Sequence, residues 1–420
     1  MSMKTEIRKI LKGELKKALG CTEPISIAYV SAKAREVLGS IPEEIEVACS
    51  ENVIKNTKSV VVPMTGNLRG IEAACLIGVV GGKAEKGLEV LEDICETDIK
   101  KTDDLLKKGI CKVVEAKTDE KFYVRVKMKY RNDEVVSVLK RTHLGINSIC
   151  KNGKIIYQRV PDEEQEQMEN YSCLTIENIF QYASEEDIGD VEDLIEEQIR
   201  CNEAISQEGL KNNYGACVGR ILLRSYGGDI RTRARAAAAA GSDARMNGCE
   251  LPVVINSGSG NQGMTVSLPV IEYSKYLKSK HETMIRALIL SNLVAIYQKY
   301  KIGRLSAYCG VISAAAGAGA GITYLYGGSK KEIEDTITNT LANVSGIVCD
   351  GAGSSCAAKI ASCVDAAILG SEMARRGSVF SPGDGIVKAD LQSTVKSIIR
   401  LAKEGMEETD RVIVDIMMNA

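Results

Sequence analysis

Strand signals are distributed unevenly along the 420 residues, and this distribution constrains the fold more than any other feature. Between residues 110 and 158, apolar and polar residues alternate in short runs such as Phe122–Tyr130 and Val135–Leu139. Turn-forming residues separate the runs at Asn132-Asp133 and Asn152-Gly153. Alternation with a period of two is typical of strands with one buried and one solvated face. The segment is therefore predicted to form an antiparallel meander.

After this segment the strand signals nearly vanish. Residues 161–170 carry five acids and no base, and we interpret them as a linker. From residue 171 onward the pattern is helical with glycine-rich interruptions. The sequence thus predicts an α+β fold: an N-terminal α+β domain with an antiparallel sheet, residues 1–165, and a larger all-α domain, residues 171–420.

Local patterns predict further elements in the first domain. A helical pattern covers residues 5–38 and breaks at Gly20–Pro24, because Pro24 suits the first turn of a second helix. Ile45–Ser50 and Ser59–Pro63 have the composition of short strands. Two more helices are predicted over Gly70–Val80 and Ala84–Cys95.

Composition and charge exclude several classes of protein. The uncharged stretch Leu305–Ser329 is long enough to span a bilayer, but its centre is Ala and Gly, so we predict a tightly packed buried helix or helix pair. Met1–Lys17 lacks the apolar core of a signal peptide, and with a pI of about 6.0 we expect a cytoplasmic protein. With 54 basic and 56 acidic residues, no general attraction to nucleic acid or to a membrane surface follows.

Cysteine usage is unusual. The chain has 14 Cys, only 2 His, no Trp and 3 Phe, so the predicted core is aliphatic. Without secretion a disulfide framework is not expected, and most thiols are interpreted as small buried hydrophobes.

A glycine-rich loop, Asn256–Gly263, follows a short apolar run. Glycine lets the backbone approach a ligand closely, and Ser257, Ser259 and Asn261 add side-chain donors. The loop matches neither a Walker A motif nor a dinucleotide fingerprint. We interpret it as a ligand site that suits a carboxylate, with a merely flexible loop as the alternative.

Three cysteines of the second half lie in glycine-rich surroundings: Cys309, Cys349 and Cys356. The spacing between the last two is wider than in zinc knuckles, and two histidines make a Cys2His2 site improbable. Three nearby thiolates suit an iron–sulfur cluster with one iron left open. On spacing alone, buried structural thiols remain the favoured interpretation.

Motifs along nearly the whole chain are similar to those of one family. They are Gly20–Ile25, Asn52–Asn56, Pro63–Gly66, Thr142-His143, Ser206–Leu210, Ser242–Met246, Ser257–Gly263, Arg304–Ala307 with Cys309, Cys349–Ala352 with Ser355–Lys359, and Thr409–Met418. In these motifs the chain resembles the L-cysteine desulfidase family, iron–sulfur proteins similar to serine dehydratase that are also grouped as UPF0597.

The resemblance implies cleavage of L-cysteine to pyruvate, ammonia and hydrogen sulfide, with a [4Fe–4S] cluster in place of pyridoxal phosphate. By position, Cys309, Cys349 and Cys356 would be the cluster ligands, and Cys21 would be the catalytic acid/base. Residues 1–165 would then be the substrate and catalytic domain, and residues 171–420 the cluster domain. The only partner expected is a small amino acid substrate, with no nucleic acid and no membrane. Whether the protein forms a homo-oligomer stays open.

Several residues keep alternative interpretations. A helix N-terminus next to Cys21 would lower its thiol pKa, but Cys21 could instead be a buried helix-start residue or a cluster ligand in place of Cys356. His143 is the rival base, although a lone histidine is more often structural. His281 is interpreted as part of a solvated helix face.

Three more residues are candidates for substrate binding. Asn52 and Lys55 would line the pocket, or else lie in a surface loop. Arg245 would pair bidentately with the substrate carboxylate, or else form a salt bridge on a helix surface.

Two other functions stay open. An iron–sulfur dehydratase of serine or a related hydroxy amino acid would use the same open iron. A non-catalytic iron–sulfur sensor would hold a cluster without turnover, and the Ser257–Gly263 loop argues against it.

Overall fold

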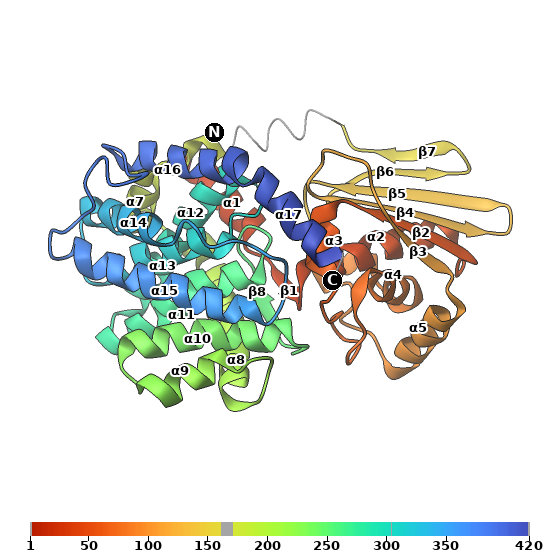
Figure 1. The fold of residues 1–420 in the computed structure, drawn as a ribbon, viewed down its shortest axis with the longest axis horizontal. Helices are drawn as coiled ribbons and strands as arrows, with labels where there is room; N and C mark the ends of the chain where they lie inside the picture. The colour runs from red at the N-terminus through yellow and green to blue at the C-terminus, as the bar shows by residue number, and fades with distance from the viewer. Residues whose placement is uncertain (1, 161–170, 304, 419–420) are drawn as a thin grey trace.

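The computed structural model describes residues 2–160, 171–303 and 305–418. It shows two parts side by side, one built on a sheet with its helices and one built from helices (Figure 1). The predicted α+β class is confirmed. The predicted linker, residues 161–170, lies outside the described residues.

The sheet has six strands in the order β3-β2-β4-β5-β6-β7. Strand β3 pairs parallel with β2, and all other neighbours are antiparallel, so the predicted meander is confirmed for β4 to β7. The strands are β2 (Glu44–Cys49), β3 (Cys111–Glu115), β4 (Tyr123–Tyr130), β5 (Asp133–Lys140), β6 (Ile146–Lys151) and β7 (Lys154–Gln158).

One face of the sheet is buried under helices. On β4 the side chains of Val124, Val126 and Met128 are fully buried, whereas the residues between them are partly exposed, which is the predicted alternation. Helix α2 packs on β4 and β5, and α4 packs on α2. The helices of this part are α2 (Thr22–Leu38), α3 (Glu51–Thr57), α4 (Gly70–Gly81) and α5 (Glu96–Lys108).

Three local predictions are wrong. The helical pattern predicted from residue 5 up to Gly20 ends at Glu14, because Lys17–Leu19 forms a short strand that pairs with Pro252–Val254. Ser59–Pro63 forms no strand; its only ladder contact is an isolated bridge between Val61 and Arg69. The helix predicted over Ala84–Cys95 is limited to the 3-10 turn η1 (Ala84–Glu89), inside which Gly87 adopts a φ of +57°. A left-handed residue interrupts a right-handed helix, so regular helix resumes only at α5.

The helical part surrounds one buried helix, α13, which packs against α11, α12, α14 and α15. The helices are α7 (Ile176–Glu185), α8 (Gly189–Lys211), α9 (Val218–Tyr226), α10 (Ile230–Met246), α11 (Gly260–Leu277), α12 (His281–Ile302), α13 (Gly310–Leu325), α14 (Lys330–Val344), α15 (Ser355–Ala374), α16 (Leu391–Arg400) and α17 (Glu407–Met418), with short turns η2 (Tyr171–Cys173) and η3 (Leu401–Gly405).

Close packing explains the small residues of α13. A Cβ on Gly317 would lie 2.4 Å from the Ser291 carbonyl oxygen of α12, a distance that only glycine avoids. The buried helix predicted within Leu305–Ser329 is therefore confirmed. Over the described residues, no helix combines the length and the apolar character needed to cross a bilayer.

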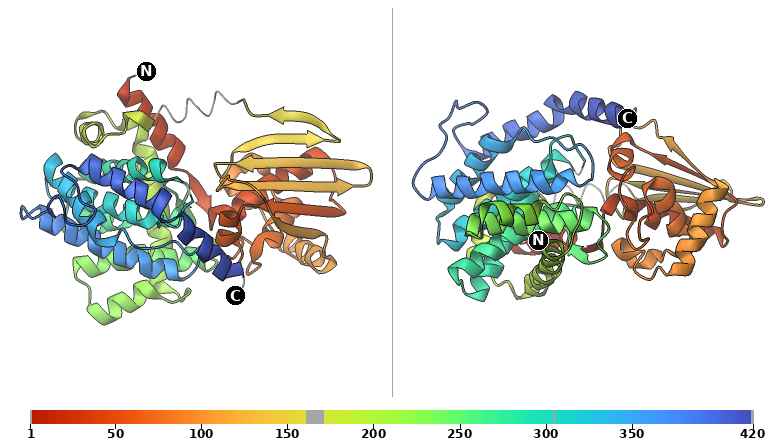
Figure 2. Two further views of the ribbon diagram at one scale, coloured as in Figure 1. Left: turned by 45° about the horizontal axis from the view of Figure 1, so that its top comes forward. Right: turned by 60° about the horizontal axis from the view of Figure 1, so that its bottom comes forward.

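The chain passes between the two parts at both of its ends. Near the start, α1 (Met3–Glu14) packs against α8 and α12, and β1 (Lys17–Leu19) pairs antiparallel with β8 (Pro252–Val254). At the other end, α17 leaves the helical part and lies against α3 (Figure 2). The division into domains at residues 165 and 171 stays a prediction.

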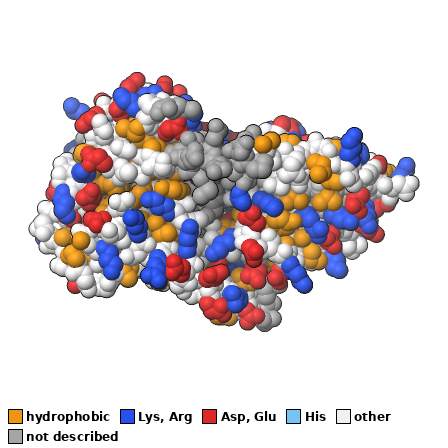
Figure 3. Space-filling view, turned by 90° about the horizontal axis from the view of Figure 1, so that it is seen from above, with side chains coloured by type: hydrophobic (Ala, Val, Ile, Leu, Met, Phe, Trp, Pro, Cys, Tyr) orange, Lys and Arg blue, Asp and Glu red, His pale blue; other side chains and the backbone are white. Residues whose placement is uncertain are grey.

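The surface carries charges of both signs. On the face seen in Figure 3, Lys and Arg side chains are interspersed with Asp and Glu over both parts of the molecule.

Candidate active site

The N-termini of four helices meet at one small cavity of about 90 Å³. Cys21, Ser259 and Cys309 are the N-cap residues of α2, α11 and α13, and Cys356 is the second residue of α15. All four line the cavity. Helix N-termini carry unpaired N–H groups and partial positive charge, so this arrangement favours thiolates and other anions.

Backbone pairing brings Cys309 next to Cys349. An isolated antiparallel bridge joins Tyr308 to Val348. The N–H of Cys309 donates to the Ile347 carbonyl at 3.2 Å, and the N–H of Cys349 donates to the Ala307 carbonyl at 2.7 Å. The segment before α13 is thus paired with the segment after α14, and the two thiols interact directly.

A tight loop places Cys356 beside the same cavity. Gly351, between Cys349 and Cys356, has a φ of +97°, and a Cβ there would lie 2.8 Å from the Lys55 carbonyl oxygen. Only glycine tolerates both the positive φ and the close approach to Lys55, and glycine at this position therefore lets the loop pass close to α3. The Cys356 thiol donates weakly to the Gly351 carbonyl at 3.8 Å.

The three thiols differ in acidity. The Cys309 thiol donates to Cys349, and with the positive charge of Lys55 it lowers the pKa of Cys349 to about 6. The same contact and burial raise the pKa of Cys309, and burial raises the pKa of Cys356. The contact therefore favours a thiolate at Cys349 over a thiolate at Cys309.

The thiols do not converge on a single point. Among the described residues, only Glu192, Glu196 and His281 form a group of three with ligand atoms all within 4.8 Å of one another. The three cysteines therefore do not enclose a mononuclear ion, whose ligands surround one centre. Separate thiolates around a larger group are what an iron–sulfur cluster requires. His281 is exposed, as predicted, and bonds to Glu196.

Cys21 is buried, and its thiol donates to a Glu23 carboxylate oxygen at 3.4 Å. Burial, followed by the negative charge of Glu23, raises the pKa of Cys21, and the positive charge of Arg245 only partly opposes this. The prediction of a lowered pKa is wrong, because loss of hydration outweighs the helix N-terminus. Cys21 thus brings a proton into the cavity at neutral pH.

Arg245, in the last turn of α10, is only 4% exposed and lines the cavity. It donates to Asn261 Oδ1 at 3.2 Å but forms no ion pair with any described carboxylate, and its Nε has no partner. The alternative of a salt bridge on a helix surface is therefore wrong. Because a buried charge without a counter-charge is costly, the guanidinium is placed to receive an anion.

The glycine-rich loop supplies the part of the wall next to Arg245. Ser259, Asn261 and Gln262 line the cavity, and the Oε1 of Gln262 is buried without a hydrogen-bond partner. A Cβ on Gly260 would lie 2.3 Å from Arg245 Nε, so glycine is needed for this approach. Ser257 does not line the cavity, and its hydroxyl bonds to Asn256 instead.

The remaining predicted residues lie outside this lining. Lys55 is buried and donates to Asp410 at 2.5 Å and to the Cys349 carbonyl at 3.4 Å. Asn52 faces a separate cavity of about 390 Å³ beside α17. His143, between β5 and β6, is buried and packs edge-on against Phe122 with ring centroids 4.8 Å apart.

Several polar lining residues were not predicted, among them Glu23, Asn56, Lys299 and Tyr308. Glu23 is buried and bonds to Cys21, Thr22 and Asn56, although it belongs to the Gly20–Ile25 motif quoted above. Lys299, only 3% exposed near the end of α12, has no distinguishing sequence signal.

Comparison with known proteins identifies the family of the chain. A family model described as "Serine dehydratase alpha chain" matches residues 85–415. A UPF0597 protein of Lachnoclostridium phytofermentans is 58% identical over 410 residues, which is 98% of either chain. The chain belongs to the serine-dehydratase-like UPF0597 family. UPF0597 proteins of Desulfitobacterium hafniense and Finegoldia magna are 49% and 47% identical, and the alignments cover 98% of this chain and 96% and 98% of theirs.

The matches cover the site unequally. The region that the serine dehydratase model matches contains Arg245, Cys309, Cys349 and Cys356 but begins after Cys21. The UPF0597 relatives match over nearly the whole chain. The family expected from the sequence motifs is confirmed.

Proposed function

We propose that this UPF0597 protein is an L-cysteine desulfidase, which cleaves L-cysteine to pyruvate, ammonia and hydrogen sulfide. One observation carries the proposal: the buried guanidinium of Arg245, without an acidic partner among the described residues, opens into the cavity that Cys309, Cys349 and Cys356 line. A site for the substrate carboxylate thus adjoins a site for a soft metal group.

The cofactor in this proposal is a [4Fe–4S] cluster held by Cys309, Cys349 and Cys356. The donor set fits, because three thiols line one cavity without converging on a single point, and because the Cys309 thiol and the charge of Lys55 lower the pKa of Cys349. When bound, the cluster would supply an open iron, a Lewis acid for the leaving sulfur.

The protein's own residues would hold the substrate and move its protons. Arg245 binds the carboxylate, and Asn261 keeps the guanidinium in place. The Cys21 thiol, which is protonated and hydrogen-bonded to Glu23, can act as the general acid that gives its proton to the leaving sulfur of the substrate thiolate. The Glu23 carboxylate, which also lines the cavity, can accept the substrate α-proton and return it to Cys21. The Cβ–S bond then breaks and the sulfur leaves as hydrosulfide. The aminoacrylate product tautomerises to an imine, and water hydrolyses the imine to pyruvate and ammonia.

The lining is compatible with a thiol leaving group. It combines apolar side chains such as Met246 and Val311 with hydroxyl and amide groups such as those of Ser259 and Asn261. A small cavity also excludes substrates with bulky side chains. The description of the matching family model favours L-serine instead, which loses water by the same chemistry.

Anaerobic purification with iron and sulfide analysis, followed by assays on L-cysteine and L-serine, tests the proposal. We expect a protein with bound iron and sulfide that releases sulfide and pyruvate in equal amounts from L-cysteine. Pyruvate from L-serine alone would identify a serine dehydratase. A cluster without turnover of either amino acid would identify a sensor.

A further inference from the structure

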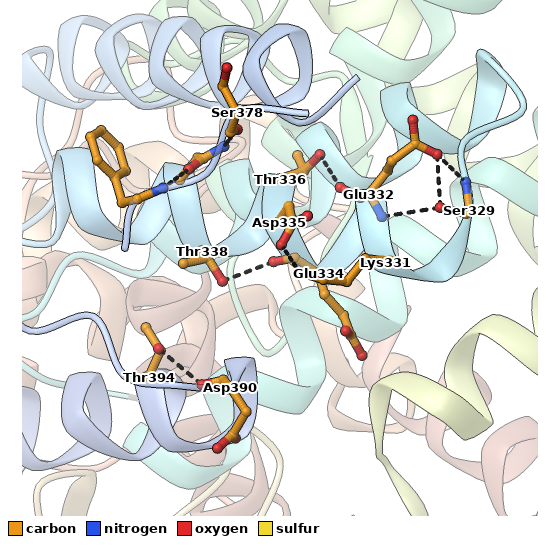
Figure 4. A network of polar contacts seen from close by, with 12 residues as sticks. Ser329, Lys331, Glu332, Glu334, Asp335, Thr336, Thr338, Ser378, Asp390 and Thr394 are labelled. Atoms are coloured by element: carbon orange, nitrogen blue, oxygen red, sulfur yellow. Dashed lines mark hydrogen bonds and ion pairs between the residues drawn. The ribbon is translucent and has the colours of Figure 1, made fainter. Parts of the chain in front are cut away.

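A second and much larger cavity, of about 650 Å³, lies among α7, α12, α14 and α16. None of its lining residues lines the thiol cavity. The segment between α15 and α16 closes one side, and Figure 4 shows α14 and α16 around it. Its volume is in the range of small-molecule binding sites.

One wall presents a cation without a counter-charge. The Lys301 ammonium lies 4.3 Å from the ring centroid of Tyr297 and 5.4 Å from that of Tyr300, and all three residues line the cavity. Lys301 forms no ion pair with any carboxylate in the described part of the chain. Burial, with the positive charge of Lys396, lowers its pKa. Aromatic faces hold an ammonium in place but do not neutralise it.

The cavity lining also contains an acid without an ion-pair partner in the described part of the chain. Glu334 on α14 lines the cavity and is half-buried, and burial raises its pKa. The lysines near it are taken by other acids, because Lys331 pairs with Asp335 and Lys330 pairs with Glu177. In Figure 4 the Thr338 hydroxyl donates to the backbone carbonyl of Glu334, whereas no contact reaches the Glu334 carboxylate, which points away from Ser329.

Two large apolar side chains also line the cavity. Val379 and Phe380 are 40% and 38% exposed, although both are large hydrophobic side chains. Their segment is held in place, because the Phe380 N–H donates to Asn339 Oδ1 at 3.1 Å and the Asn339 amide donates to the Ser378 carbonyl at 3.0 Å. An ordered apolar surface inside a cavity is suited to an apolar part of a ligand.

We propose that this cavity is a second binding site for a zwitterion of the α-amino-acid type with an apolar side chain. Its carboxylate meets Lys301, its ammonium meets Glu334, and its side chain packs on Phe380. A purely anionic ligand would leave the Glu334 carboxylate unpaired and would repel it. A purely cationic ligand would leave the Lys301 ammonium unpaired and would repel it. The volume admits either a free amino acid or a short peptide with free termini.

Isothermal titration calorimetry on the full chain measures what the carboxylate and the ammonium of the ligand each contribute to binding, without any mutation. The probes are L-phenylalanine, the dipeptide L-leucyl-L-phenylalanine, 3-phenylpropionate without the ammonium, and 2-phenylethylamine without the carboxylate. We expect at least one zwitterion to bind at least about tenfold more tightly than both singly charged analogues. Tighter binding of the dipeptide would identify a peptide site, and tighter binding of phenylalanine a free amino acid site. Equal affinities of all probes, or no binding at millimolar concentration, would overturn the proposal.

Binding measurements on variants show which of the two cavities holds the ligand. Lys301→Met and Glu334→Gln should each weaken binding of the better zwitterion at least about tenfold. The exposed matched controls Lys154→Met and Glu250→Gln should leave it unchanged. Arg245→Gln should also leave it unchanged, since Arg245 lines only the other cavity. Loss in Arg245→Gln with retention in Lys301→Met would place the ligand among the thiols and overturn the proposal.

Discussion

The ion pair between Lys55 and Asp410 ties the C-terminal helix α17 to α3 across the two parts of the molecule. Its Nζ–Oδ1 distance is 2.5 Å, and the two side chains are only 1% and 8% exposed. Asp410→Asn keeps the shape of the side chain but leaves the Lys55 ammonium buried without its counter-charge. Removing one partner of such a pair costs about 3–5 kcal/mol.

The structure limits how much of this free energy appears as a loss of global stability. Apart from Asp410, the only buried side chain among the described residues of α17 is Val414, so the helix has little else to hold it. Once α17 detaches, Lys55 regains water, and the loss of global stability cannot exceed the free energy of docking α17. We therefore expect α17 to open locally, with its amides exchanging about 10²–10³-fold faster than in the wild type.

Native-state hydrogen exchange measured by mass spectrometry, with urea denaturation beside it, is the assay. Glu407→Gln, at an exposed position of the same helix, should exchange like the wild type. The double variant Lys55→Met/Asp410→Leu, which replaces both charges by apolar groups, should regain most of the protection. Unchanged exchange of α17 in Asp410→Asn would refute the view that this pair holds the helix.

The other predictions concern the site and its surroundings. Cys21→Ala should keep its iron but lose at least about 10²-fold in turnover, whereas His143→Ala should lose less; iron loss in Cys21→Ala would make it a ligand instead. Cys349→Ser should lose iron and activity together, and Cys95→Ser, at an exposed position, should keep both by iron analysis and sulfide assay. Burial raises the pKa of Asp243 from 3.8 to about 6, so the folded state binds an extra proton between these values. The stability that this proton contributes, about 3 kcal/mol, is present below pH 4 and lost as the pH rises through 6. Asp243→Asn should therefore flatten the dependence of the unfolding free energy on pH, as followed by urea titrations at several pH values.

The sequence alone determined those features that depend on near neighbours along the chain. Alternation over Phe122–Tyr130 and Val135–Leu139 predicted β4 and β5, because successive side chains of a strand face opposite sides of the sheet. The break before Pro24 predicted the start of α2. The same reasoning failed at Ala84–Cys95, where Gly87 turns left-handed and ends the helical pattern.

Only the tertiary structure decided the chemistry of the site. Cys309 and Cys349 meet because Tyr308 pairs with Val348, a backbone contact that leaves no periodic signal. Cys21 begins a helix, as the sequence predicted, yet the pKa of its thiol is raised, because segments distant in the chain exclude water from it. Arg245 has the sequence pattern of an ordinary helical arginine, and only the structure shows that it is buried without an acidic partner among the described residues, which is the basis for proposing it as a binding residue. Periodicity reports which side of an element is apolar, whereas hydration and charge pairing depend on everything that packs around a group.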